Sequence, residues 1–203
     1  MKNALVLSLL LASMLLYARD RLNAPNITYP EEFFLHNGGR ILDVTQPPFN
    51  AAGDGITDDT DAINAAYNYI ADIHRTYDQW NAIDENYIIY FPQGEYLVSN
   101  SIIYDAPRLE YGTQREKGIF HVRFVGQNRD KTIIKLKDNC EGFNSRRKKY
   151  LLCLQMPGQG TNIPGRNEIR NLTINTGSGN IGAAAVYYVS ANTGIISNVS
   201  IIS

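Results

Sequence analysis

Residues 51–63 read AAGDGITDDTDAI, a glycine turn followed by the start of a helix. Gly53 and Gly55 flank Asp54, and glycine tolerates the positive φ angles that a sharp turn requires. The apolar residues that follow recur at helical spacing, which predicts a helix of about four turns from near Asp59 to near His74. This stretch therefore marks a turn that leads into an amphipathic helix.

The acids in this stretch are typical of a helix start. Thr57, Asp58 and Asp59 offer side-chain oxygens to the free N–H groups of the first helical turn, and acids stabilise the positive end of a helix dipole. A calcium loop of the EF-hand kind needs a glycine at its sixth position and a glutamate at its twelfth. Counting from either Asp54 or Asp58 gives neither residue. We therefore predict structural acids and no metal site.

Composition limits the classes of partner. The chain has 203 residues, enough for one domain, and its 20 acids against 19 bases give a net charge of −1. That balance gives no support for a nucleic-acid partner or an anionic membrane surface. The basic run at residues 146–149 is interpreted as a solvated loop.

The first residues resemble an export signal. Lys2 precedes an apolar run over residues 4–16, which is short for a membrane span and fits the core of a signal peptide. Residues 1–18 are predicted to be the signal peptide and residues 19–39 a lead-in segment. We expect a secreted, periplasmic or cell-surface protein with no membrane contact beyond this segment, although Leu16 fits the cleavage rule poorly and leaves an uncleaved anchor as the lesser alternative.

The two cysteines leave two alternatives open. Cys140 and Cys153 would form one disulfide in an exported protein. They would equally serve as small, buried apolar residues. Two cysteines alone do not make a metal site.

The rest of the chain has the pattern of an all-β protein. Runs rich in β-branched and aromatic residues alternate with Gly, Asn, Asp and Pro, and no segment of helical period lies between the later runs. That argues against βαβ units. The predicted strands are 41–44, 87–91, 95–98, 120–125, 132–136, 151–156, 169–175, 184–189 and 194–202.

Two strands repeat at an offset of 27 residues. Residues 168–174 (EIRNLTI) align with residues 195–201 (IISNVSI), which places Asn171 opposite Asn198. Repeats of this length indicate a solenoid, and an asparagine at the same place in successive turns is typical of a stacked ladder in a parallel β-helix. Both asparagines, like Asn26, also begin glycosylation sequons, but the ladder role is favoured.

Together these motifs resemble a known family. The run at residues 53–66, the segment YFPQGEYLV at residues 90–98, and the later segments at 169–174 and 177–180 are similar to the pectate-lyase-superfamily domain shared by rhamnogalacturonase, epimerase-like and glycoside-hydrolase-28-related proteins. The similarity covers about residues 40–203. It implies a right-handed, single-stranded parallel β-helix whose N-terminal end is capped by the helix after the glycine turn.

The resemblance also implies a substrate class. Members of the family mostly cleave polysaccharides, often acidic glycans, so the expected partner is a polysaccharide and the expected reaction is glycoside hydrolysis. The alternatives are a lyase acting by β-elimination, a non-catalytic glycan-binding or adhesive β-helix, and a tailspike-type protein. No cofactor is expected, and calcium enters only as a candidate cofactor of the lyase alternative. The oligomeric state is not predicted.

The sequence assigns no catalytic residue. Glycoside hydrolysis generally needs two carboxylates about 5 to 10 Å apart, and residues 142–203 contain a single acid, Glu168. Asp130 and Asp138 are interpreted as turn residues. The other residues considered are assigned structural roles: His74 at a helix end, His121 in a strand, and Tyr187 and Tyr188 with one ring on each side of a strand.

The last strand is followed by no capping segment. Solenoids normally need terminal caps, because bare strand edges template aggregation. We therefore expect this chain to be the N-terminal part of a longer β-helix, truncated before its catalytic coils.

Overall fold

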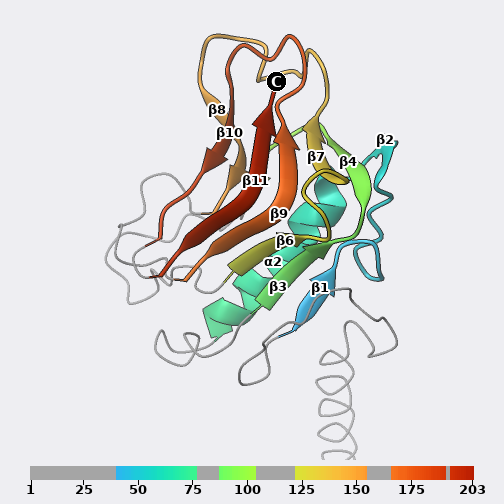
Figure 1. Cartoon of the computed structure of the whole chain (residues 1–203), viewed down its shortest axis with the longest axis vertical. Coiled ribbons are helices and arrows are strands. Elements are labelled where there is room, and N and C mark those ends of the chain that lie inside the picture. The colour runs from blue at the N-terminus through green and yellow to red at the C-terminus, as the bar shows by residue number, and fades with distance from the viewer. Residues whose placement is uncertain (1–39, 77–86, 104–121, 155–165, 191–192) are drawn as a thin grey trace, which may run out of the picture.

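The computed structural model describes residues 40–76, 87–103, 122–154, 166–190 and 193–203. The predicted signal peptide (1–18) and lead-in segment (19–39) lie outside these residues. In the described part, one helix and a series of short strands surround a common core (Figure 1). The elements are β1 (Ile41–Asp43), β2 (Asp54–Asp58), α2 (Thr60–Thr76), β3 (Tyr87–Phe91), β4 (Gly94–Val98), β5 (Ile102–Ile103), β6 (Val122–Gly126), β7 (Thr132–Leu136), β8 (Lys149–Cys153), β9 (Glu168–Asn175), β10 (Ala183–Tyr187) and β11 (Ile195–Ile202).

The strands stack in parallel on three faces. Face 1 consists of β1, β3, β6 and the first halves of β9 and β11; face 2 consists of β2, β4, β7 and the second halves of β9 and β11; face 3 consists of β5, β8 and β10. Each strand pairs with the strand at the same place in the preceding coil, and all pairs are parallel. This is the predicted parallel β-helix.

The strand β9 joins faces 1 and 2 without a loop. Its residues 168–170 pair with β6 and its residues 173–175 pair with β7. Between the two halves, Asn171 has a φ of 56°, a left-handed conformation that asparagine adopts more readily than most residues. Gly126 lies beneath this corner, where an added Cβ would come within 2.2 Å of the Asn171 carbonyl oxygen. The corner therefore requires a glycine at position 126 and a residue that tolerates a positive φ at position 171.

The next coil repeats this corner. Strand β11 stacks on β9 with Ile195 opposite Glu168, so the offset of 27 residues is confirmed. Asn198 has a φ of 49°, and its Nδ2 donates a hydrogen bond of 2.9 Å to Oδ1 of Asn171. The predicted asparagine ladder is therefore present.

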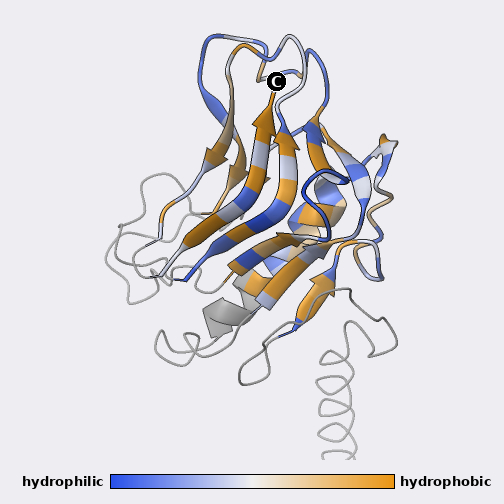
Figure 2. Ribbon diagram, in the orientation of Figure 1, coloured by the Kyte–Doolittle hydropathy of each residue, from blue (hydrophilic) through white to orange (hydrophobic). Residues whose placement is uncertain are grey.

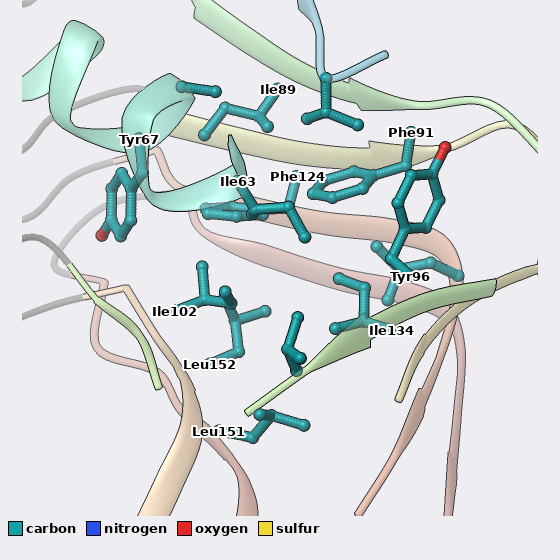
Figure 3. Close-up of a cluster of buried hydrophobic side chains, with 14 of the residues drawn as sticks. Ile63, Tyr67, Ile89, Phe91, Tyr96, Ile102, Phe124, Ile134, Leu151 and Leu152 are labelled. Atoms are coloured by element: carbon teal, nitrogen blue, oxygen red, sulfur yellow. The ribbon is translucent and has the colours of Figure 1, made fainter. Parts of the chain in front are cut away.

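The core lies between the three faces (Figure 3). Alternate residues of each strand point inward, among them Phe91, Phe124 and Ile134, which are fully buried. The rings of Phe91 and Phe124 stack with centroids 6.0 Å apart. Each side chain of this size contributes about 1.5–3 kcal/mol when it is fully buried. The core continues through successive coils. Figure 2 shows hydrophobic and hydrophilic residues following one another along β9 and β11.

Helix α2 packs one apolar face on this core. Ile63, Ala66, Tyr67 and Ile70 are fully buried, which matches the predicted helical spacing. The Tyr67 ring meets the Phe124 ring edge-on at 5.2 Å, and its hydroxyl donates to the Cys153 carbonyl oxygen at 3.0 Å. The helix is confirmed, and it ends two residues beyond the predicted position.

The acids before the helix differ from the prediction in their partners. Asp58 Oδ1 accepts the N–H of Thr60, as expected for a helix start. The Asp59 carboxylate instead turns back and accepts the N–H groups of Ala52 at 2.6 Å and Gly53 at 3.0 Å. The prediction that Asp59 caps the helix with its side chain is wrong, because the turn before the helix brings two unpaired N–H groups closer.

The predicted glycine turn also contains a strand. Gly53 and Gly55 do have positive φ angles, of 60° and 75°. Residues 54–58 nevertheless pair with β4 and form β2, although the register shifts between Asp54 and Asp58. The sequence prediction missed this strand because its residues, DGITD, favour turns in isolation. It also missed β5, which has only two residues. The other strands are confirmed to within two residues at the predicted ends that fall on described residues, whereas the predicted positions 120–121 and 155–156 lie outside the described residues.

A buried polar side chain hydrogen-bonds one coil to the next. Asn180 is 8% exposed, and its side chain makes three hydrogen bonds to the backbone. Its Oδ1 accepts from the Cys140 N–H at 2.7 Å, and its Nδ2 donates to the carbonyl oxygens of Lys137 and Thr176, both at 2.8 Å. The side chain thereby pairs backbone groups that the turns leave unpaired.

The cysteines are free and buried. Cys140 and Cys153 form no disulfide with each other, so the second alternative from the sequence holds. Burial raises the pKa of the Cys153 thiol to about 11 and also raises the pKa of Cys140. Both effects disfavour the reactive thiolate at neutral pH.

We expect the folded protein to react slowly with a thiol reagent at pH 7. Unfolding in denaturant without reductant should release two reactive thiols per chain, because both cysteines are free. The rate should rise as the pH approaches the raised pKa. A denatured, unreduced chain that releases no thiol would show a disulfide and contradict the structure.

Candidate functional site

The outer surface of face 1 changes character along the solenoid. One outward row holds Ile41, Ile88, Arg123, Glu168 and Ile195. In the early coils the outward residues are apolar apart from the buried Asp43 of β1. Ile88, Tyr90 and Val125 form a small buried cluster, packed by Ile41. Charged residues follow in β6 and β9. The polar chemistry of face 1 is therefore concentrated on its later coils.

Arg123, Glu168 and Arg170 form the main group of charges, here named the Glu168 cluster. The Nε atom of Arg123 donates to Oε2 of Glu168 from the neighbouring coil. The Nε atom of Arg170, two residues farther along β9, lies 3.4 Å from Oε1. The side chains of Arg123 and Glu168 are only 16% and 13% exposed. Glu168 is thus held between two guanidinium groups in a partly desolvated position.

The chemistry of the Glu168 cluster suits binding. Two guanidinium groups and one carboxylate leave an excess of one positive charge, and guanidinium N–H groups are suited to carboxylates and other oxygen-rich groups. Hydrolysis needs a second carboxylate at a suitable distance. Among the described residues, the outward rows of face 1 add only Asp43, three strands from β9. The cluster therefore provides binding groups and no acid–base pair.

Face 2 places two carboxylates on adjacent strands. Asp54 of β2 and Glu95 of β4 are directly opposite in the parallel register, and neighbouring strands lie about 4.8 Å apart. Lys135 lies on β7, the next strand of face 2, and its Nζ lies 3.1 Å from Oε1 of Glu95. This register places two carboxyl-bearing residues on adjacent strands of the same face.

The carboxylate of Asp54 is hydrogen-bonded within its own turn. Its Oδ1 accepts the N–H groups of Thr57 at 2.7 Å and Ile56 at 2.9 Å, and its Oδ2 accepts the Thr57 hydroxyl at 2.9 Å. These hydrogen bonds, led by that of the Thr57 N–H, hold the pKa of Asp54 below its ordinary value. The carboxylate is stabilised in its charged form and holds the turn, so its role is structural.

Face 3 carries a pair of tyrosines, Tyr150 of β8 and Tyr187 of β10. Their ring centroids are 5.0 Å apart at an angle of 55°. Neither ring belongs to the core, whereas the neighbouring Tyr188 packs on it and donates its hydroxyl to the Asn167 carbonyl oxygen at 2.6 Å. The expected alternation of the two rings is therefore present. We name Tyr150 and Tyr187 the tyrosine pair.

The remaining predicted residues have structural positions. Asp130 is exposed and pairs with Arg129 at 2.7 Å, and Asp138 accepts the Ser178 N–H at 2.8 Å, so both are turn residues as predicted. Residues 144–148 are exposed, as expected for a solvated basic loop. Lys149 leaves this loop, donates to Asn100 Oδ1 at 2.8 Å and lies over the Phe143 ring.

The histidines contribute no described side chain. His74 lies in α2, but its side chain is outside the described part, and His121 precedes the described start of β6. Among the side chains that are described, no group of three or more His, Cys, Asp or Glu residues is arranged to hold a metal ion. In the same part of the chain, no helix has the length and apolar character needed to span a membrane.

The sequence prediction missed the Glu168 cluster and the Asp54–Glu95 pairing. Arg123 and Glu168 are 45 residues apart, and Asp54 and Glu95 are 41 apart, so neither pair follows the 27-residue repeat. The alternation within each strand does signal which residues point outward. The register between coils was needed to bring them together.

Residues 47–203 match the family model described as "Rhamnogalacturonase A/epimerase, pectate lyase-like". The match includes every described strand from β2 onward. No curated protein matches the sequence.

We expect Glu168→Gln to lower the free energy of unfolding by about 1.5–3 kcal/mol, because it removes partly buried, charge-assisted hydrogen bonds and leaves two guanidinium groups without their anion. Urea denaturation of the variant measures this change. The control is Asp130→Asn, which removes an exposed ion pair and should change stability little. Equal effects of the two substitutions would contradict the assigned roles.

Proposed function

The chain belongs to the rhamnogalacturonase A/epimerase, pectate lyase-like family, and from this membership we propose that it acts on polysaccharides by glycoside hydrolysis. The observation that carries the proposal is the family match over residues 47–203, together with a parallel β-helix in the same residues. Solenoids present long, regular outer surfaces that suit extended ligands.

Two outer surfaces support contact with a glycan. The Glu168 cluster offers guanidinium N–H groups that suit hydroxyl and carboxylate oxygens. The tyrosine pair offers half-buried aromatic rings with a polar end, a combination common in binding sites. These groups lie on faces 1 and 3, so a glycan chain is proposed to contact one of them.

The catalytic residues stay unassigned. Asp54 and Glu95, which lie on adjacent strands of face 2, are engaged by the Asp54 turn and by Lys135. This observation favours a second candidate, a non-catalytic glycan-binding β-helix. The β-elimination alternative, with calcium as its cofactor, rests on the family alone. Export to the cell surface or beyond remains part of the proposal through the signal-like residues 1–18.

The test is incubation of the purified chain with a panel of neutral and acidic polysaccharides. Hydrolysis predicts new reducing ends without ultraviolet absorbance from unsaturated products. Ultraviolet absorbance from unsaturated products would show β-elimination in place of hydrolysis. Binding of a glycan without release of any product would support the second candidate. Neither binding nor release across the panel would contradict the proposed function.

The contribution of the tyrosine pair can be measured on any glycan that binds. If the glycan binds on face 3, Tyr187→Ala should weaken binding by about fivefold or more, as for the loss of an aromatic contact residue. Ile181→Ala is the control, because Ile181 is 69% exposed and lies outside the pair. If both variants bind as the parent does, the glycan does not contact the tyrosine pair.

A further inference from the structure

The outer surface of face 1 carries apolar side chains that are buried away from the core. Ile88, Tyr90 and Val125 are 0–2% exposed and form a cluster separate from the core, with Ile41 packed against it. We name these four residues the outer cluster. The residues that alternate with them on β1, β3 and β6 point into the core. The outer cluster therefore lies on the side of the sheet that faces away from the core.

Neighbouring strands alone do not account for this burial. Ile133 of β7 is the matched case on face 2, because it points outward between the paired strands β4 and β9. Ile133 remains partly exposed. Ile88 and Val125 also lie between two paired strands, yet both are 0% exposed. The outer cluster therefore needs a cover beyond its neighbours in the sheet.

The described helix and strands do not supply this cover. Helix α2 packs on the core side, and in Figure 1 it lies behind β3 and β6. Every described strand belongs to one of the three faces. The segments 19–39, 77–86 and 104–121 lie outside the described residues and lead directly into β1, β3 and β6. The cover is therefore expected in one of these three segments.

The lead-in segment (residues 19–39) has the composition of such a cover. Residues 33–35 are Phe-Phe-Leu, a continuous run of large apolar side chains. Gly38 and Gly39 follow this run, and glycines allow the chain to reverse its direction just before β1. The five residues 34–38 span up to about 17 Å when extended, and β6 lies two strand spacings, about 10 Å, from β1. The run can therefore reach the whole outer cluster.

Charge and connection also favour the lead-in segment. The Glu168 cluster adjoins the outer cluster on β6 and β9, and it has an excess of one positive charge. Glu31 and Glu32 directly precede the Phe-Phe-Leu run, which suits them to guanidinium groups beyond the outer cluster. Residues 77–86 are acidic too, but they are joined to α2 on the core side as well as to β3. The lead-in segment is joined to a described element only at β1.

We propose that the lead-in segment folds back on face 1 and covers the outer cluster with residues 33–35. The chain reverses at Gly38 and Gly39, and Glu31 and Glu32 lie toward the Glu168 cluster. The partner of this surface is thus a segment of the same chain. The proposal does not depend on the proposed glycan chemistry or on removal of the predicted signal peptide.

A cysteine reporter in the full chain tests whether the outer cluster is covered. Val125→Cys places a thiol in the cluster, and Ile195→Cys places one on the same face at a residue that is 52% exposed. We expect the Val125→Cys thiol to react with a thiol reagent at least about tenfold more slowly. The buried Cys140 and Cys153 show in each variant whether the chain stays folded.

Replacement of residues 33–35 by three serines tests which segment is the cover. The Val125→Cys thiol should then react about tenfold faster or more, because the apolar contacts that exclude the reagent are lost. The Ile195→Cys thiol and the two natural thiols should keep their rates, which shows that the change is local.

The matched controls remove apolar residues from the other two segments. One control combines Trp80→Ser with Ile83→Ser, and the other combines Ile119→Ser with Phe120→Ser. Both should leave the Val125→Cys thiol protected. If either control exposes this thiol while the three serines at 33–35 do not, the cover is a different segment and the proposal is wrong.

A second measurement leaves the segment apolar. Benzoylphenylalanine in place of Phe34 keeps an aromatic side chain and forms cross-links on irradiation, which mass spectrometry locates. We expect cross-links to β3 or β6, within residues 87–91 or 122–126. Cross-links that fall only outside face 1 would contradict the proposal. So would a Val125→Cys thiol that reacts as fast as Ile195→Cys in the parent chain, or one that stays protected with three serines at 33–35.

Discussion

The structure depends on the pairing of each strand with the strand one coil before it. Backbone N–H and C=O groups in the interior of a solenoid have no other partners, and leaving them unpaired is costly. The strands of faces 1 and 2 must therefore keep a fixed register while the chain turns from one face to the next. Asn171 and Asn198 make this turn within continuous strands, through a left-handed backbone and a side-chain hydrogen bond between coils. Asn180 and Asp138 have similar roles where the turns are longer, because their side chains pair with backbone groups of another coil.

The sequence predicts this arrangement well where the connections are short. The ladder pair was found because β9 and β11 are separated by only 27 residues and their corners contain no insertion. Earlier coils stack at offsets of 47, 35 and 45 residues along face 1, since α2 and longer connecting segments intervene, and no repeat is visible in their sequences. Strand boundaries followed from composition, except for β5 and β2. The partner of Asp59 could not be predicted, because it depends on how tightly the chain folds back before the helix.

The candidate site illustrates the same limit. The alternation within a strand identifies Arg123, Glu168 and Arg170 as outward residues, but their contact depends on the 45-residue offset between β6 and β9. The acids that are most conspicuous in the sequence, at residues 54–59, hold turns together through backbone N–H groups. The groups suited to a glycan are instead arginines and tyrosines on the outer faces. The family implies a polysaccharide as the ligand, and these groups are the contacts proposed for it.

The most direct test of the account separates two contributions of Asn171 to the corner, its left-handed backbone and its side-chain hydrogen bond to Asn198. Asn171→Gly keeps the left-handed conformation accessible and removes only the amide, whereas Asn171→Ala also imposes a strained backbone that costs about 1–2 kcal/mol. Urea denaturation should therefore show that the alanine variant is less stable than the glycine variant by about 1 kcal/mol or more, with both less stable than the parent. A glycine variant that is as unstable as the alanine variant, or less stable, would contradict the claim that this corner depends on a left-handed backbone at residue 171.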